Sequence, residues 1–280
     1  MNKLLHKVAH KCKRHPMLYF VRYALLSKNH TAKNADAIGC FNDSNTMDSI
    51  PKLYFEVNAK INVDPTQDEL EKALTIGKFL RKTIVGGSGI GLSSEKTLEM
   101  MLAGEGGVCS DFAQVFNIFC FINGIRVKEW GTVDCFYKTK FGHSFNEIYS
   151  TQQQKWIAID IHKAIIFEDV AHNNFFSVID LFNDLRAGNP LRAKHYSEYM
   201  TWQQERIPLV YSQHAMPFLI ENKENSIVDY YYNKLQNSMP IVIINVLLVL
   251  LRKNQTFIFV LDDYKMKLLP KYFQNLKLSS

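Results

Sequence analysis

The sequence predicts an α+β fold in which an apolar helix packs on an antiparallel sheet and further helices lie towards both ends of the chain. A segment with apolar side chains at helical spacing begins near Cys109 and ends at Asn123-Gly124. Three short segments of strand character follow it, "IRVKEWGTVDCF", "GHSFNEIYS" and "KWIAIDI". Beyond residue 170 the apolar residues return to a helical spacing.

The composition indicates a globular chain of one to two domains. Its 280 residues are 47% hydrophobic and 21% charged, with 13 Gly and 8 Pro. Such a chain buries enough apolar surface to offset the entropy of ordering, which excludes a disordered, collagen-like or repeat protein. We predict a basic arm and linker at residues 1–45, a core at residues 46–170 and a mostly helical extension at residues 171–280.

The first part of the core is predicted to hold one strand and two helices. The alternation of apolar and polar residues in "KLYFEVNAKINVD" indicates an early strand. Thr66 and Glu69 have the spacing of a capping box and predict a helix in "PTQDELEKALTIGKFLRKTI". Ser93 or Ser94 is the predicted cap of a helix through "EKTLEMML". The glycine-rich loop between these helices lacks the Lys-Ser/Thr of a P-loop and does not fit GxGxxG, so we expect no nucleotide site there.

The extension is predicted to hold three helices and a strand. They lie in "FFSVIDLFNDLRAG", "NSIVDYYYNKLQ", the apolar residues 239–251 and "TFIFVL". The apolar run of 13 residues, which has Asn245 in its middle, would rise about 20 Å as a helix, less than the bilayer core of about 30 Å. Because Ser238 suits an N-cap and Pro240 a first turn, a buried helix is favoured. A membrane-embedded segment is the alternative.

Positive charge is concentrated in the first 35 residues, which hold eight Lys or Arg and no Asp or Glu, whereas the other 245 hold 25 basic and 27 acidic residues. Lys3, Lys7 and Lys11 recur at four-residue spacing and predict a short amphipathic helix. We expect residues 1–35 to make weak contact with an anionic membrane surface or an acidic partner, a solvated helix being the alternative. The arm lacks interleaved aromatic residues and nucleic-acid motifs, so no specific nucleic acid is expected.

The cysteines indicate a reduced, intracellular chain. Their number is odd, they are far apart and they form no CxxC pair, which argues against a disulfide framework or a zinc ribbon. They are Cys12, Cys40, Cys109, Cys120 and Cys135. No apolar stretch of the arm is long enough for a signal peptide, so we expect a cytoplasmic protein, with membrane association as the alternative. Only His6 and His10 have HxxxH spacing, and they lie too near the terminus for a dedicated site, so no histidine metal site is expected.

Cys109 is a candidate nucleophile because a glycine-rich turn leads into the helix that it begins. The positive end of the helix dipole and free backbone N–H groups at that point favour the reactive thiolate. A cysteine in this position is more often only a small buried residue, so a partner base is needed. Cys120 lies eleven residues further on, about three turns, and is predicted to be an inert packing residue.

Hairpin geometry supplies a candidate base and acid. We consider a hairpin in which strands 142–150 and 155–161 pair through a symmetric turn with an even number of residues, either 151–152 or 150–153. In such a hairpin, residues whose numbers sum to 303 face one another. His143 and Asp160 meet this condition. Opposed residues have Cβ atoms about 4.5–5.5 Å apart, close enough for a carboxylate to orient an imidazole. The alternatives are a surface His143 and an Asp160 that caps a turn. His162 is less favoured because this register places it opposite Phe141.

Three blocks of the chain resemble those of the transglutaminase-like superfamily, a branch of the papain-like cysteine enzymes: "GVCSDFAQVFNIFCFINGIRVKEWGT", "GHSFNEIY" and "KWIAIDI", spanning about residues 95–167. The resemblance implies a papain-like core with Cys109 as nucleophile, His143 as base and Asp160 as its orienting acid. Phe145 stands where the family often has Trp, and Ile161 where Pro often follows the Asp. The paired zinc cysteines of the peptide N-glycanase branch are absent, which argues against glycopeptide deglycosylation.

The resemblance further implies a peptidase, amidase or acyltransferase that attacks an amide or ester bond through an acyl-enzyme, without a metal or organic cofactor. Its substrate would be a protein, a peptide or another amide-containing molecule. The backbone N–H of Cys109 is a natural oxyanion donor. The alternative is a catalytically inactive domain of this family that serves as a protein-binding module. Retention of Cys109, His143 and Asp160 together favours the enzyme.

Overall fold

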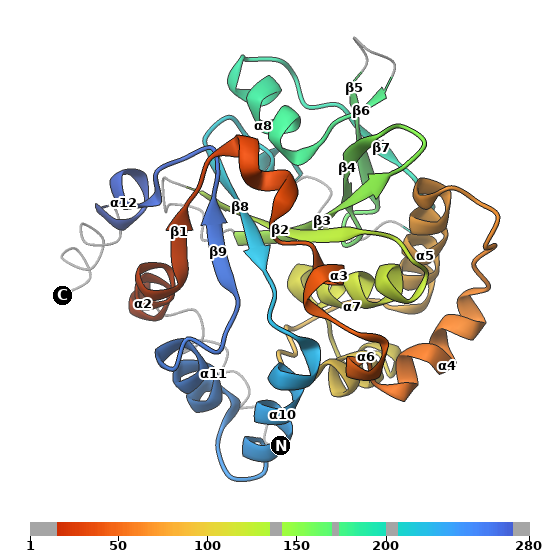
Figure 1. The fold of residues 1–280 in the computed structure, drawn as a ribbon, viewed down its shortest axis with the longest axis vertical. Helices are drawn as coiled ribbons and strands as arrows, with labels where there is room; N and C mark the ends of the chain where they lie inside the picture. Colours follow the sequence, from red (N-terminus) through yellow and green to blue (C-terminus); the bar gives the residue numbers. More distant parts are fainter. Residues whose placement is uncertain (1–15, 135–141, 170–173, 200–206, 271–280) are drawn as a thin grey trace.

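The computed structural model describes residues 16–134, 142–169, 174–199 and 207–270. These residues form a nine-stranded sheet with helices packed on both faces (Figure 1). The strand order is β1, β9, β8, β2, β3, β4, β5 and β6, with β7 also paired to β5. β1 pairs with β9 in parallel, and the other described pairs are antiparallel. The predicted α+β class is confirmed.

The strands are β1 Ser27–Asn29, β2 Val127–Asp134, β3 Gly142–Ser150, β4 Lys155–Asp160, β5 Ile165–Asp169, β6 Asn174–Phe175, β7 Ala193–His195, β8 Ala215–Glu221 and β9 Thr256–Phe259. The α-helices are α2 Pro16–Leu26, α3 Phe41–Ser44, α4 Lys52–Ile61, α5 Glu69–Thr83, α6 Ser94–Leu102, α7 Cys109–Ile122, α8 Val178–Arg186, α9 Ile207–Val210, α10 Asn225–Leu235, α11 Ile241–Leu250 and α12 Tyr264–Lys267. Short 3-10 helices cover Ala32–Ala37 and Met47–Ser49.

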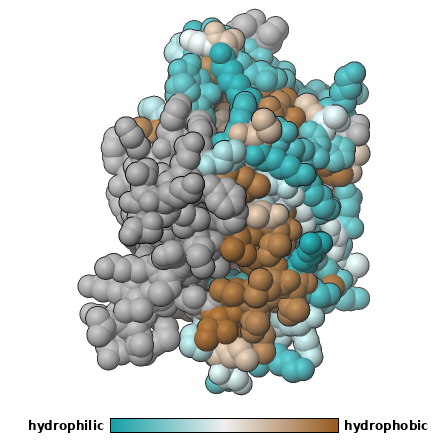
Figure 2. Space-filling model, turned by 90° about the vertical axis from the view of Figure 1, so that its left-hand side faces the viewer, coloured by the Kyte–Doolittle hydropathy of each residue, from teal (hydrophilic) through white to brown (hydrophobic). Residues whose placement is uncertain are grey.

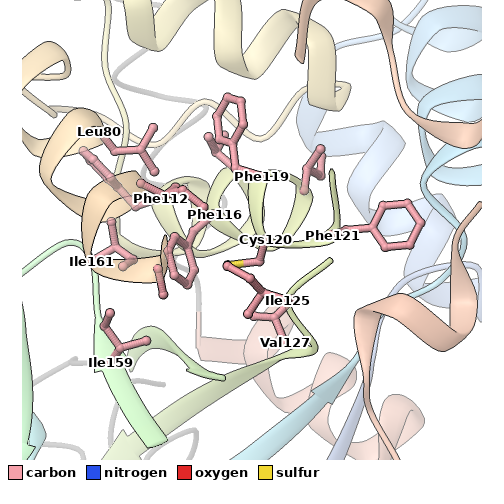
Figure 3. Close-up of a cluster of buried hydrophobic side chains, with 14 of the residues drawn as sticks. Leu80, Phe112, Phe116, Phe119, Cys120, Phe121, Ile125, Val127, Ile159 and Ile161 are labelled. Atoms are coloured by element: carbon pink, nitrogen blue, oxygen red, sulfur yellow. The ribbon is translucent and has the colours of Figure 1, made fainter. Parts of the chain in front are cut away.

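α7 is the central helix because its side chains are apolar on nearly every side. It lies between the sheet and helices α4, α5 and α6, and its aromatic residues fill the main core (Figure 3). Cys120 is fully buried beside Ile125 in this cluster, and burial raises the pKa of its thiol well above the usual value. The prediction that Cys120 is a packing residue is confirmed. α8 covers the opposite face of the sheet, over Phe145 and Phe167.

Residues 52–61 form helix α4, so the predicted early strand is wrong. The buried side chains Tyr54, Val57 and Ile61 recur at intervals of three and four residues, which is the period of a helix rather than of a strand. The alternation of the short segment is outweighed by this longer pattern. The helix ends where Asn62 adopts a left-handed conformation, with φ of 55°.

The predicted cap of α5 is also corrected. The N-cap is Asp68, whose carboxylate accepts from the backbone N–H of Glu71, whereas Thr66 bonds to Asp64. An Asp is a strong N-cap and stands closer to the apolar periodic segment than Thr66 does. Ser93 occupies the N-cap position of α6, one of the two predicted residues.

The C-terminal third of the chain contains helices and also adds strands to the same sheet. β8 lies beside β2, and β9 lies between β8 and β1. The predicted helices in residues 175–188 and 225–236 and the predicted strand at residues 256–261 correspond to α8, α10 and β9. β8 has no counterpart in the sequence analysis. The boundaries of the three predicted parts stay a prediction.

The apolar residues 239–251 contain α11, whose N-cap position is Pro240 rather than Ser238. Ile244, Leu248 and Val249 are buried, whereas Ile243 and Leu250 are exposed. The helix favoured from the sequence as buried is therefore buried on one side and exposed on the other. Among the described residues, no helix is both long and apolar enough to cross a membrane. The predicted amphipathic helix at residues 1–14, with Cys12 in it, and Cys135 lie outside the described residues.

Candidate active site

Cys109 is the first residue of α7, as predicted, and two glycine-containing loops hold the start of this helix. Gly87 donates to the carbonyl of Gly107, and Gly107 donates to that of Ser88. A side chain at Gly106 would stand 2.5 Å from the Ser88 carbonyl oxygen, and the φ of Gly106 is +153°. Only glycine permits the two loops to approach so closely.

The carboxylate of Asp111 fixes the geometry before Cys109. It accepts hydrogen bonds from the backbone N–H groups of Val108, at 2.9 Å, and of Ile90, at 3.2 Å. A negative side chain in the first turn also suits the positive end of the helix dipole. The sequence "VCSD" therefore caps its own helix and ties it to the neighbouring glycine loop.

His143 and Asp160 lie on adjacent antiparallel strands, but the predicted register is wrong by two residues. Ser150 pairs with Lys155, so opposed residues sum to 305 and the turn consists of residues 151–154. Glu69 of α5 accepts hydrogen bonds from the backbone and the hydroxyl of Thr151, and Gln154 has a φ of 51°. This contact with α5 and the left-handed residue accompany the longer turn, and neither is visible as a local sequence pattern.

The side chains of His143 and Asp160 nevertheless meet, because a shift of two residues keeps each side chain on its face of the sheet. Nε2 of His143 lies 2.6 Å from Oδ2 of Asp160. The pair is diagonal rather than directly opposed, a distance that a long side chain spans. This bond leaves Nδ1 as the ring nitrogen available to the thiol of Cys109.

Asp160 is fully buried and accepts from three donors within the described part of the chain. Besides His143, the hydroxyl of Tyr211 donates to Oδ2 at 2.9 Å and the backbone N–H of Lys163 donates to Oδ1 at 2.9 Å. Burial opposes the charge of this carboxylate, but the positive charge and hydrogen bond of His143 outweigh it and lower the pKa of Asp160. Asp160 is therefore a fixed anion behind the imidazole.

His143 is only 6% exposed, and burial alone would lower the pKa of its imidazole. The charges of Asp160 and Cys109, together with hydrogen bonds to both side chains, outweigh burial and raise the pKa of His143 to about 10. The imidazole is therefore protonated at neutral pH. An imidazolium beside a thiol stabilises the thiolate that acts as a nucleophile.

Aromatic rings hold the His143 imidazole in place. The ring of Phe145 is nearly parallel to it, with centroids 6.3 Å apart and planes inclined by 10°, and Tyr211 meets it edge-on at 5.8 Å. Phe145 stands where the resembling family often has Trp, and it still gives His143 a flat aromatic neighbour. Such contacts restrict the rotation of the imidazole.

Two residues of the site were missed or ranked low by sequence reasoning. His162 lies 5.9 Å from His143 between ring centroids. Burial, and then the positive charge of His143, lowers the pKa of His162 to about 3, so this second imidazole is neutral. In a register where the numbers of opposed residues sum to 305, His162 would have been identified as the residue opposite His143. Tyr211, which follows α9, has no signal in the sequence, because nothing local links it to a residue 51 positions away.

Cys109, His143 and His162 line a cleft of about 920 Å³. Its walls also include Tyr23 of α2 and Val249 of α11. The cleft is large enough for a segment of a polypeptide or another extended molecule. Among the described residues, no three His, Cys, Asp or Glu side chains are grouped so as to hold a metal ion.

In the comparison with known proteins, one family model matches part of the chain. The model of the transglutaminase-like superfamily matches residues 56–161, which include Cys109, His143 and Asp160. No curated protein matches the chain. Among solved structures, "The Crystal Structure of a Putative Cysteine Protease from Cytophaga hutchinsonii" is 18% identical, with a TM-score of 0.31, and the match covers 40% of this chain and 40% of that chain. That likeness is too weak to carry fold or activity over.

Proposed function

Residues 56–161 match the model of the transglutaminase-like superfamily, and on this premise we propose that the chain is a cysteine hydrolase or acyltransferase that attacks an amide or ester bond. Cys109 is the nucleophile, His143 is the general acid and base, and Asp160 orients His143. The substrate is a protein, a peptide or another molecule with an accessible acyl group. The observation that carries the proposal is the 2.6 Å bond between His143 Nε2 and the buried Asp160 Oδ2, together with the fact that His143 and Cys109 line the same cleft.

The reaction follows from these positions. The Cys109 thiolate attacks the carbonyl carbon, and the carbonyl electron pair moves to the oxygen. As the tetrahedral intermediate collapses, His143 gives its proton to the leaving amine or alkoxide, and a thioester to Cys109 remains. Neutral His143 then removes a proton from water or an acceptor amine, which attacks the thioester and releases the thiolate and the acyl product.

Asp160 and its donors keep the imidazole ready for both proton transfers. Because Asp160 occupies Nε2, the proton that moves during the reaction is carried on Nδ1. The buried carboxylate, held by Tyr211 and by the Lys163 backbone, fixes the ring without exchanging partners with water. In this proposal the backbone N–H of Cys109, at the start of α7, donates to the developing oxyanion.

Selective alkylation of Cys109 tests the proposal. We use a Cys12→Ser/Cys135→Ser background, so that the buried Cys40 and Cys120 are the internal controls. Iodoacetamide at neutral pH is expected to add one group, on Cys109, and the rate is expected to fall more than about tenfold in His143→Ala. Cys109→Ala should take up none. Equal labelling of all three thiols, or an unchanged rate in His143→Ala, would overturn the proposal in favour of an inactive binding domain.

A further inference from the structure

α11 carries apolar side chains on two opposite sides, and only one side is covered. Ile244 and Leu248 pack on Tyr232 of α10. Val249 belongs to the buried cluster that also holds Tyr23 and Phe257. On the outer side, Ile243 is 48% exposed and Leu250 is 57% exposed, and the next residue, Leu251, is 61% exposed. Residues at these intervals share one face of a helix. A helix that is apolar all round is normally buried in something.

A hydrophobic area lies on the side of the molecule that carries α11. Figure 2 looks at the side of the molecule where Figure 1 places α2, β1 and α11, and brown residues gather in its lower half. Contiguous exposed apolar surface of this kind marks an interaction site. We define the docking face as Ile243, Leu250 and Leu251.

Basic residues stand at the edge of the docking face. Arg252 and Lys253 follow Leu251 directly and are exposed, and the described residues give neither of them an acidic partner within ion-pair distance. Aliphatic side chains and unpaired cations are therefore presented side by side.

We propose that the docking face binds the surface of an anionic lipid bilayer. The aliphatic side chains enter the boundary between headgroups and acyl chains, and Arg252 and Lys253 contact lipid phosphates. A second copy of the chain fits less well, because it would bring the same cations to both sides of a symmetric contact, and residues 241–253 contain no acid to pair with them. The ten residues of α11 rise about 15 Å, so the helix lies on the bilayer rather than across it.

The proposal does not depend on catalysis. The inner sides of α2 and α11 line the cleft of Cys109 through Tyr23 and Val249, so docking would place one wall of that cleft beside the lipid. The residues that contact lipid are nevertheless separate from Cys109, His143 and Asp160. Cys109→Ala is therefore expected to bind vesicles as well as the wild type does, which separates this proposal from the proposed enzyme activity.

Vesicle co-sedimentation of the full chain tests the proposal. Vesicles are made of phosphatidylcholine alone or with phosphatidylserine. We expect wild-type protein to sediment with the anionic vesicles, and Leu250→Ser/Leu251→Ser to bind at least about tenfold more weakly. Arg252→Gln/Lys253→Gln is expected to lose about 30-fold on anionic vesicles and to be unchanged on neutral ones. The matched control is Val85→Ser, which removes a 73% exposed apolar side chain after α5 and should bind as the wild type does.

Two results would overturn the proposal. One is equal sedimentation of the wild type and Leu250→Ser/Leu251→Ser, since the exposed leucines would then contribute nothing. The other is lipid-free dimerisation of the wild type that this double variant abolishes, without vesicle binding, because the docking face would then be an interface between two copies. Sedimentation velocity in the absence of lipid reads this second outcome, and circular dichroism checks that the surface variants fold.

Discussion

The hydroxyl of Tyr211 donates a 2.9 Å hydrogen bond to Oδ2 of Asp160, the same oxygen that lies 2.6 Å from Nε2 of His143. Tyr211 is 1% exposed and lies outside the segment that matches the family. A residue supplied by the C-terminal third of the chain therefore completes the environment of the proposed triad. The burial of Asp160 leaves this carboxylate dependent on such donors rather than on water.

Tyr211→Phe removes this donor and keeps the ring. The free energy of unfolding is expected to fall by about 1–3 kcal/mol, because a hydrogen bond to a buried charge is lost. The His143 Nε2–H proton resonance is expected to move downfield, since Asp160 becomes a stronger acceptor for that proton. Tyr149→Phe is the control, as the Tyr149 hydroxyl makes no hydrogen bond within the described residues. An unmoved resonance in Tyr211→Phe would show that Tyr211 has only a packing role.

Asp160→Asn tests the source of the His143 protonation. The negative charge of Asp160 is the largest of the contributions that raise the pKa of His143 to about 10, and burial opposes it. Without that charge, the pKa of His143 should fall to its ordinary value or below, so that the ring is mostly neutral at neutral pH. An NMR titration of the His143 ring protons measures the pKa directly. Asp43→Asn, an exposed change on α3, should leave the titration where it is, and an unchanged pKa in Asp160→Asn would contradict the assigned cause.

Glu129 gives stability a pH dependence of its own. Burial raises the pKa of this carboxyl to about 8, against hydrogen bonds from Asn222 and Asn117 that favour the charged form. The folded state therefore holds a proton that the unfolded state has released, and stability is lost as pH rises from about 4.5 to 8.

Glu129→Gln keeps an amide oxygen for both asparagines and removes the ionisation. We expect the variant to be more stable than the wild type at pH 8, by a few kcal/mol at most, and the difference to vanish near pH 4. Urea denaturation across this pH range measures it. A difference that stays constant with pH would mean that Glu129 has no raised pKa.

Local patterns predicted the parts of the site that are contiguous in the chain. The glycine turn before Cys109, the length of α7 and the three following strands are all encoded in neighbouring residues. The pairing of His143 with Asp160 was also predicted, although through a register that is off by two residues. The prediction survived because side-chain facing depends on whether the register shift is even, and the shift is even.

The rest of the structure depends on contacts between distant residues. The four-residue hairpin turn is joined to Glu69, which lies 82 residues from Thr151, and Tyr211 reaches Asp160 from beyond the matched domain. The sequence predicts a strand where α4 lies, because apolar and polar residues alternate there over a few positions. The buried side chains of this segment are spaced by three and four residues, which fits a helix. Such features follow from tertiary packing and leave little trace in a local window.

Acylation by p-nitrophenyl acetate, followed by intact mass and peptide mapping, tests the central claim most directly. The account predicts one acetyl group per chain, carried as a thioester on Cys109, with a burst of one equivalent of nitrophenolate. The burst should be absent in Cys109→Ala and slowed more than about tenfold in His143→Ala. Acetylation that persists in Cys109→Ala, or that spreads over other residues at the same rate, would contradict a nucleophilic Cys109 activated by His143.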